Sequence, residues 1–334
     1  MTLSSPDPAT AFRAARDAAF VAWLPGVAVL EADGPDTIAF LHAQLSSDVA
    51  GLQAGAAQWS TYNSPKGRML ATLLVWRPAE GPACRLALAA DLAEPIRKRL
   101  SMFVLRSKVK LVVPDPAPPA LGVGGPAAAD AVRRALGVDA APLRAVDVDG
   151  GGTSIGLPDG RILVVAPPAA AGAIHARLAA HAAAAGEDAW RWLGIRAGVA
   201  QVTLATQERH VAQTANWEVV GGVSFAKGCY PGQEIVARSQ HLGILKERAH
   251  PFHVAAPPPA PATPVYSRTF GEQACGSIVD SVALPDGGSD LIAVVQLAAV
   301  ESGDLHVGAP DGPALERLPL PYALPASAPK RVKL

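Results

Sequence analysis

Residues 221–246 read GGVSFAKGCYPGQEIVARSQHLGILK, and this stretch carries the most specific pattern in the chain. Lys227 stands close before Cys229, and Pro231 is suited to the first turn of a helix that residues 233–238 continue. Cys229 is therefore expected just ahead of a helix N-terminus. The helix macrodipole and a neighbouring ammonium both favour a thiolate at such a position. A redox or nucleophilic cysteine needs that thiolate character.

Two charged side chains extend this candidate site along the expected helix. Glu234 falls in the first turn, where it complements the macrodipole, and Arg238 falls one turn later on the same face. The spacing alone leaves an alternative open, because a lone cysteine is more often a small buried hydrophobe than a reactive group. Cys84 and Cys275 lie in strand-like runs and are expected to have that buried role.

Composition bounds the class of protein. The chain has 334 residues, of which 50% are hydrophobic, and this indicates about two globular domains. Lys and Arg equal Asp and Glu at 29 each, so charge gives no reason to expect a nucleic-acid or membrane partner. Three distant cysteines, with no CxxC pair, favour a reducing, cytoplasmic location and no metal site.

Patterning predicts strands that alternate with helices, followed by a small β-rich part. The residues 255–264, AAPPPAPATP, indicate an extended spacer, and short alternating segments come after it. The expected domains are a body over 1–250, with a possible internal break near 114–126, a proline-rich linker over 251–264, and a β-barrel over 265–327. Expected strands cover 26–32, 71–77, 85–89, 109–113 and 161–166, and expected helices cover 36–45, 91–103, 127–137, 169–185 and 190–198.

The motif KGCYPGQE (227–234) resembles the signature of the YgfZ family, which is Lys-Gly-Cys-aromatic-x-Gly-Gln-Glu. The resemblance spans nearly the whole chain and is weakest at about residues 115–185. It implies the fold of the glycine-cleavage T-protein group, an α+β fold with a two-part body, a C-terminal β-barrel and a tetrahydrofolate-shaped pocket. Further segments resemble the family in the same order: FLHAQLSSDV (40–49), NSPKGRM (63–69), FVLRSKVKL (103–111), WRWLGIRAGVA (190–200) and LPLPYAL (318–324).

The function that this resemblance implies is that of a folate-binding accessory protein. Members of the family support the assembly or repair of iron–sulfur enzymes, including those that thiolate tRNA. The implied partners are folate and iron–sulfur proteins or their assembly factors, with no direct nucleic-acid partner and no membrane. Cys229 takes the role of the motif's reactive cysteine, with Lys227 and Arg238 beside it. The residues expected to bind folate are Trp190, Gln213, Asn216, Lys227 and Glu234.

Two other functions remain as alternatives. A tetrahydrofolate-dependent aminomethyltransferase carries an acidic pair after the glycine of the Lys-Gly-Arg loop, and one of those carboxylates moves a proton. Leu70 and Ala71 occupy the matching positions here and cannot do so. The chain is therefore not expected to be an enzyme of that type. The second alternative is a folate-binding module without chemistry. Lys66 and Arg68 could meet a folate glutamate tail, although such exposed cations are usually only solvated.

Overall fold

The computed structural model describes residues 7–242 and 245–325, and these residues form two compact units. Unit 1 comprises residues 7–42, 49–58 and 73–193. Unit 2 comprises residues 43–48, 59–72 and the described residues from 194 onward. The chain therefore passes between the units more than once, and each unit is described by itself.

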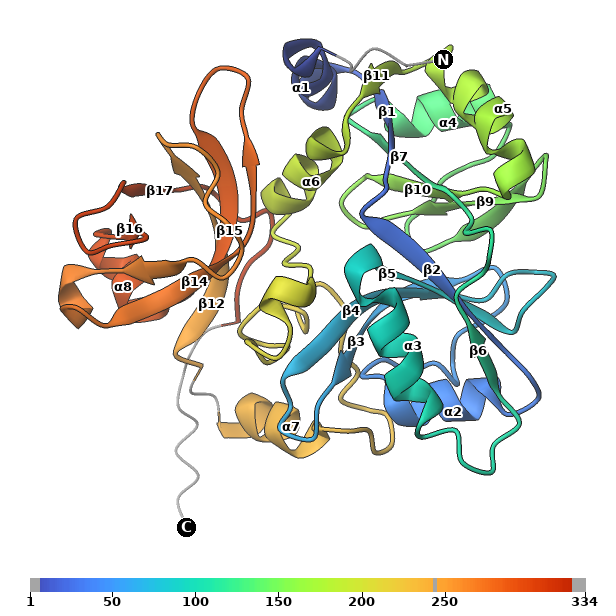
Figure 1. Ribbon diagram of the computed structural model, residues 1–334, viewed down its shortest axis with the longest axis horizontal. Helices are drawn as coiled ribbons and strands as arrows, with labels where there is room; N and C mark the ends of the chain where they lie inside the picture. Colours follow the sequence, from blue (N-terminus) through green and yellow to red (C-terminus); the bar gives the residue numbers. More distant parts are fainter. Residues whose placement is uncertain (1–6, 243–244, 326–334) are drawn as a thin grey trace. The chain divides into compact units, whose positions relative to one another are not determined.

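The first sheet of unit 1 has six strands in the order β11-β1-β7-β10-β9-β8. Figure 1 labels its strands β11, β1, β7, β10 and β9. The strand pairs of this sheet are antiparallel except for β1 and β11, which are parallel. Helices α1 (Pro8–Asp17), α4 (Ala128–Leu136) and α5 (Pro168–Ala179) accompany it. The strands are β1 (Phe20–Trp23), β7 (Ala120–Gly124), β8 (Ala145–Val148), β9 (Gly152–Gly156), β10 (Ile162–Val165) and β11 (Ala183–Ala185).

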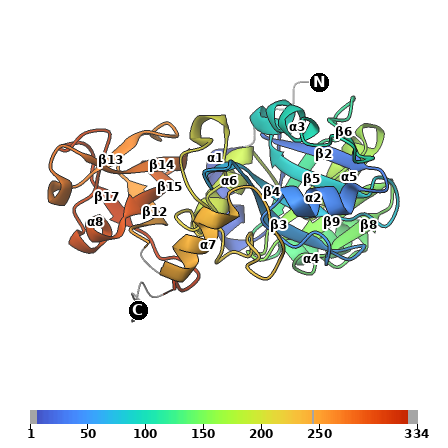
Figure 2. The same ribbon diagram turned by 90° about the horizontal axis from the view of Figure 1, so that it is seen from below.

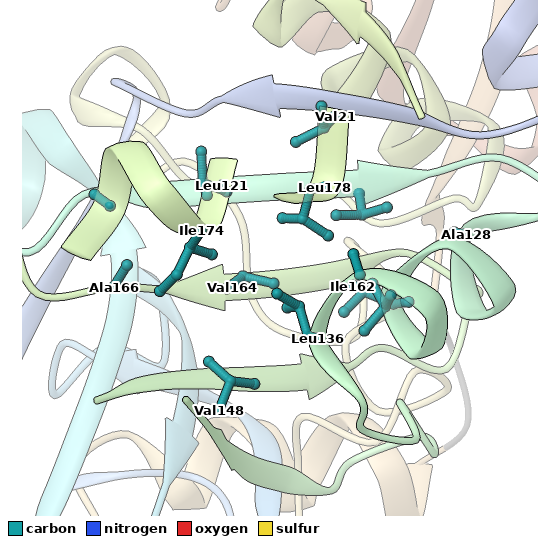
Figure 3. Close-up of a cluster of buried hydrophobic side chains, with 14 residues drawn as sticks. Val21, Leu121, Ala128, Leu136, Val148, Ile162, Val164, Ala166, Ile174 and Leu178 are labelled. Atoms are coloured by element: carbon teal, nitrogen blue, oxygen red, sulfur yellow. The ribbon is translucent and has the colours of Figure 1, made fainter. Parts of the chain in front are cut away.

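The core of this part of unit 1 forms where α4 and α5 meet the sheet. Figure 3 shows Val21, Leu121 and Val164 of the strands together with Leu136 and Ile174 of the helices. All five side chains are nearly inaccessible to solvent. Their burial supplies the main stabilisation of the layer, at roughly 25 cal/mol per Å² of apolar surface removed from water.

A second sheet has five strands in the order β3-β4-β5-β2-β6. Strand β4 is buried along its whole length, as its apolar run predicts. Strands β3 and β4 each contribute residues to both units. The elements of this part are β2 (Val27–Asp33), α2 (Thr37–Gln44), β3 (Ala57–Asn63), β4 (Met69–Trp76), β5 (Cys84–Ala89), the 3-10 helix η1 (Ala90–Leu92), α3 (Ala93–Ser101) and β6 (Lys110–Val112).

The C-terminal sheet belongs to unit 2 and has the order β16-β13-β14-β15-β12-β17. Figure 2 labels its strands β12, β13, β14, β15 and β17. The sheet is curled and antiparallel, a half-barrel, with a core that includes Phe252, Ile278 and Leu291. The predicted α+β fold with a C-terminal barrel is confirmed. The elements are β12 (Glu247–Val254), β13 (Pro264–Tyr266), the 3-10 helix η3 (Arg268–Phe270), β14 (Ala274–Ala283), β15 (Ser289–Gln296), α8 (Leu297–Ser302), β16 (His306–Val307) and β17 (Leu315–Arg317).

Two sequence expectations differ from the structure. Residues 251–254 were expected in the linker, yet they form the second half of β12, which pairs with β15 from Glu247 to Val254. The expected helix over 169–185 ends at Ala179, and 183–185 form β11 beside β1. The other domain bounds remain predictions, and residues 326–327 of the expected barrel lie outside the described residues. Unit 2 also contains η2 (Leu204–Thr206) and α7 (Gln233–Leu242), while α6 (Glu187–Arg196) runs from unit 1 into unit 2.

Candidate functional site

Two loops of unit 2 carry the motifs that the sequence singles out. The hairpin loop, residues 64–68, joins β3 to β4, and the cysteine loop, residues 221–232, leads into α7. The hairpin loop is a tight turn, in which the Ser64 amide donates to the Arg68 carbonyl at 2.8 Å and the Gly67 amide donates to the Ser64 carbonyl at 2.8 Å. Gly67 adopts a φ of 72°, a conformation that glycine takes without strain.

The two loops contact each other backbone to backbone through two glycines. Gly232 has a φ of 78°, and a Cβ atom there would come within 2.5 Å of the Ser64 carbonyl oxygen and 2.6 Å of the Gly67 Cα. A Cβ at Gly67 would come within 2.8 Å of the Ile235 Cβ in α7. Figure 1 shows α7 beside the tip of the β3–β4 hairpin. Only glycine fits at these two positions, so the contact fixes the cysteine loop against the hairpin loop.

Helix α7 begins at Gln233, so Pro231 lies outside the helix and not in its first turn as the sequence predicts, because Gly232 between them has a φ of 78°. The Val236 amide donates to the Gly232 carbonyl at 3.3 Å, which closes the first helical turn. Cys229 therefore lies just ahead of the helix N-terminus, and its side chain is exposed. Glu234 and Arg238 are exposed on the helix. The expected contact of Glu234 with folate and the expected role of Arg238 beside Cys229 remain predictions.

Lys227 points into the protein interior. Its Nζ donates to the carbonyl of Leu45 and lies 4.9 Å from the centroid of the Tyr230 ring. Burial lowers the pKa of Lys227 to about 8, and the nearby carboxylate of Asp48 acts against this decrease. The side chain therefore anchors the cysteine loop and can release its proton more readily than an exposed lysine. Its predicted role beside the thiol of Cys229 remains a prediction.

The three cysteines differ in accessibility. Cys84 and Cys275 are 0% and 2% exposed, and burial raises the pKa of each thiol to about 11. Their expected role as small buried hydrophobes is confirmed. Cys229 is exposed and forms no disulfide. It is the thiol that a partner protein or a small reagent can reach.

Gln213 and Asn216 are fully buried and belong to a network of polar contacts that includes a hydrogen bond to α7. Gln213 Nε2 donates to the Val236 carbonyl of α7, which ties this segment to the helix. Asn216 Nδ2 donates to the Ala249 carbonyl at 2.8 Å and to the Tyr322 hydroxyl at 3.2 Å. The two amides therefore have structural contacts, and their expected contact with folate stays a prediction.

Several buried polar atoms of unit 2, some of them in or next to the hairpin loop, remain unpaired within the part of the chain that the structure describes. Both amide atoms of Asn63, the hydroxyl of Ser64 and Oε1 of Gln213 have no hydrogen-bond partner. All three side chains are at most 3% exposed. An unsatisfied buried polar group costs about 1–3 kcal/mol, so such groups often mark a ligand site. No sequence pattern marks Asn63 or Ser64 as site residues, although both stand in the segment NSPKGRM (63–69).

Trp190 belongs to unit 1 and lies on α6. Its ring contacts Gly122, where a Cβ would come within 2.5 Å of the indole, and the guanidinium of Arg161 lies 4.6 Å from the ring centroid. The residue is 5% exposed. These contacts give Trp190 a place in the core of unit 1, and its expected contact with a pterin remains a prediction.

The positions that would carry the acidic pair of an aminomethyltransferase are apolar and closed. Leu70 and Ala71 are 3% and 0% exposed in β4, and the Leu70 carbonyl accepts a hydrogen bond from Gln207 at 2.9 Å. Across the described residues, no group of three or more His, Cys, Asp or Glu side chains is arranged to hold a metal ion. A helix long and apolar enough to cross a bilayer is likewise not found among them.

The fold defines the class to which the chain belongs. No protein-family model matches the sequence. The structure is similar to that of the glycine cleavage system aminomethyltransferase T from Bartonella henselae, with a TM-score of 0.74 over 94% of this chain and 89% of that chain. The two sequences are 16% identical, so the likeness shows the fold alone. The chain has the aminomethyltransferase T fold.

Sequence relatives then identify the family within this fold. The chain is 30% identical over 308 residues to the tRNA-modifying protein YgfZ of Sodalis glossinidius (strain morsitans). The aligned residues cover 89% of this chain and 91% of the relative. The chain is 27% identical over 310 residues to the protein of the same name from Vibrio vulnificus (strain YJ016), with 91% and 92% covered. The chain belongs to the YgfZ family, as the motif around Cys229 indicates.

Proposed function

We propose that this protein is a folate-binding accessory factor that supports the assembly or repair of iron–sulfur enzymes, including enzymes that thiolate tRNA. The observation that carries the proposal is the exposed thiol of Cys229 in a loop that the protein fixes from two sides. The buried ammonium of Lys227 anchors the loop on one side, and the contact between Gly67 and Gly232 anchors it on the other. A thiol held in this way keeps its position while it remains open to a partner.

The chemistry of the thiol suits iron–sulfur partners. Cysteine thiolates are the usual ligands of iron–sulfur clusters, and the thiolate is also the form of an exposed cysteine that reacts with other sulfur atoms. One thiol alone does not make a complete cluster site. Cys229 would therefore act on a cluster or a persulfide that a partner protein presents. The relatives are named tRNA-modifying proteins, and thiolation is a tRNA modification that depends on such sulfur chemistry.

Complementation of a strain that lacks this gene tests the role of Cys229. We expect the Cys229→Ser variant to leave tRNA thiolation at the level of the deletion strain, because a hydroxyl replaces the thiol at the same place. The Cys84→Ala variant is the control, because it removes a thiol that is fully buried. Thiolated nucleosides are measured by mass spectrometry. Full thiolation with Cys229→Ser would remove the cysteine from the proposal.

The residues around the hairpin loop fit a reduced folate. A pterin ring carries adjacent hydrogen-bond donors and acceptors on its edge. The unpaired amide of Asn63 offers one donor and one acceptor, and Ser64 and Gln213 offer further unpaired oxygens. A bound tetrahydrofolate would supply a readily oxidised pterin and carry one-carbon units. Asn63, Ser64 and Gln213 would hold its polar edge, and their burial would exclude competing water.

A pair of serine variants tests the folate site. Ser64 and Ser154 are both buried with unpaired hydroxyls, but Ser154 lies in β9 of unit 1. We expect Ser64→Ala to weaken the binding of 5-formyltetrahydrofolate about tenfold, the loss of one buried hydrogen bond. Ser154→Ala should leave the affinity unchanged. Isothermal titration calorimetry measures both affinities, and equal affinities in the two variants would contradict the site.

A further inference from the structure

A cavity of about 440 Å³ opens within unit 2, and the sequence motifs do not account for it. It is lined by residues from the hairpin loop, from the segment 208–210 and from strands β12, β14 and β15. Its size lies within the range of pockets that hold small organic molecules. The side chains that bear on its chemistry are Arg68, Glu208, Arg209, His210, Glu247 and Ser277.

The lining of the cavity combines two arginines with a buried imidazole. His210 is 8% exposed, and its Nε2 lies 3.5 Å from the Oγ of Ser277. Burial, together with the smaller effects of the charges on Arg209 and Arg68, lowers the pKa of His210 to about 4. The ring is therefore neutral at pH 7. Because the positive charges of Arg209 and Arg68 lower the pKa of His210, both guanidinium groups must lie close enough to raise the electrostatic potential at the imidazole ring.

The same lining limits how much negative charge the cavity can accept. The carboxylates of Glu208 and Glu247 also face it, and Glu247 accepts a hydrogen bond from Gln296 at 2.9 Å. The thiol of Cys275 lines the cavity too, and burial raises its pKa to about 11, so it stays uncharged at pH 7. Two carboxylates repel a ligand that carries more than one anionic group. A ligand with a single oxyanion group matches this balance.

We propose that this cavity binds a small organic acid or phosphate ester through one oxyanion group, held between Arg68, Arg209 and the His210–Ser277 pair. Guanidinium groups bind carboxylates and phosphates with charge-assisted hydrogen bonds, and a serine hydroxyl adds a neutral donor. Arg68 is already oriented, because its guanidinium donates to the carbonyl of Arg209. A bound anion next to His210 would stabilise the protonated ring, so the pKa of His210 would rise on binding. The proposal does not depend on folate or on Cys229.

Nuclear magnetic resonance titration of the full chain tests the site, with acetate and methyl phosphate as separate probes. Sodium chloride keeps the ionic strength constant, so that screening of the arginines does not imitate binding. We expect saturable shifts of the His210 and Ser277 signals, and a rise in the His210 titration midpoint toward the ordinary value of histidine. A response to acetate alone identifies a carboxylate ligand, and a response to methyl phosphate alone identifies a phosphate ester.

Two arginine variants make the test specific. Arg209→Gln should weaken probe binding about tenfold, because it removes a charged donor from the cavity. Arg268→Gln is the control, since Arg268 is 84% exposed in the same unit and does not line the cavity. Equal effects of the two variants would show non-specific ion binding and overturn the proposal. So would His210 and Ser277 signals that do not respond to millimolar concentrations of either probe.

Discussion

The Gly232→Ala variant is expected to lose about 3 kcal/mol of stability and to release the cysteine loop from the hairpin loop. An added Cβ would meet the Ser64 carbonyl oxygen at 2.5 Å and the Gly67 Cα at 2.6 Å, and both are backbone atoms. Backbone cannot move aside as a flexible side chain does. The φ of 78° adds strain for any residue with a Cβ. Urea unfolding measures the loss of stability.

Gly228→Ala is the matched control for that variant. Gly228 stands next to Cys229 in the same loop, and a Cβ there would meet nothing within 4 Å. We expect its stability to match the parent within about 0.5 kcal/mol. Gly232→Ala should also reduce tRNA thiolation in the complementation assay, because Cys229 loses its fixed position, whereas Gly228→Ala should not. Equal stability of the two variants would contradict the backbone contact between the loops.

The Arg248→Met variant is expected to lose about 3–5 kcal/mol, the usual cost of breaking a buried ion pair. Arg248 and Glu218 form this pair with side chains that are 4% and 5% exposed. Arg248 also donates to the Gln213 carbonyl at 2.7 Å and to Oδ1 of Asn216 at 3.3 Å. Removal of the guanidinium leaves the carboxylate of Glu218 buried without its counter-charge. Thermal and urea unfolding measure the loss.

The pH dependence of the stability of the Arg248→Met variant shows whether the buried carboxylate of Glu218 causes the loss of stability. Burial raises the pKa of Glu218, and Arg248 acts against that increase, so the pKa should rise further in the variant. In the folded variant Glu218 then keeps a proton that it releases in the unfolded state. The stability of the variant therefore falls as the pH increases above 4.5, the ordinary pKa of a glutamate. The deficit should therefore shrink at acid pH. The double variant Arg248→Met with Glu218→Leu should recover more than half of the loss, and a deficit independent of pH would point to another cause.

These two predictions concern one framework, which comprises the cysteine loop, the hairpin loop, α7 and the segment 213–218. Gly232 holds the cysteine loop on the hairpin loop, and Arg248 supports the segment 213–218, which contacts α7 through Gln213. The proposed thiol chemistry depends directly on the position of the cysteine loop, which Gly232 fixes, whereas Arg248 contributes stability without contact with that loop. A loss of stability at Arg248 should therefore reduce complementation only when the protein unfolds, whereas Gly232→Ala should reduce it in a protein that is still folded.

Patterns within a short window of sequence predicted those helices and strands that a start residue or an apolar run marks clearly. The helix after Pro231 and the buried strand β4 follow from a helix-starting residue and from an unbroken apolar run. The segment 183–185 misled the prediction, because three alanines favour a helix locally, while the structure pairs them with β1. Strand pairing depends on residues far apart in the sequence, and a local window does not contain it.

The sequence by itself determined the family, the α+β class and the candidate cysteine, because a rare motif of contiguous residues encodes them. Only the tertiary structure decided that the thiol of Cys229 is exposed, where the ammonium of Lys227 points, and that Gly67 and Gly232 touch. It also brought Arg68, His210 and Ser277 to one cavity, from a hairpin loop, a later segment and a barrel strand. The physical reason is that burial and electrostatic potential at a side chain are sums over its neighbours in space, and folding chooses those neighbours.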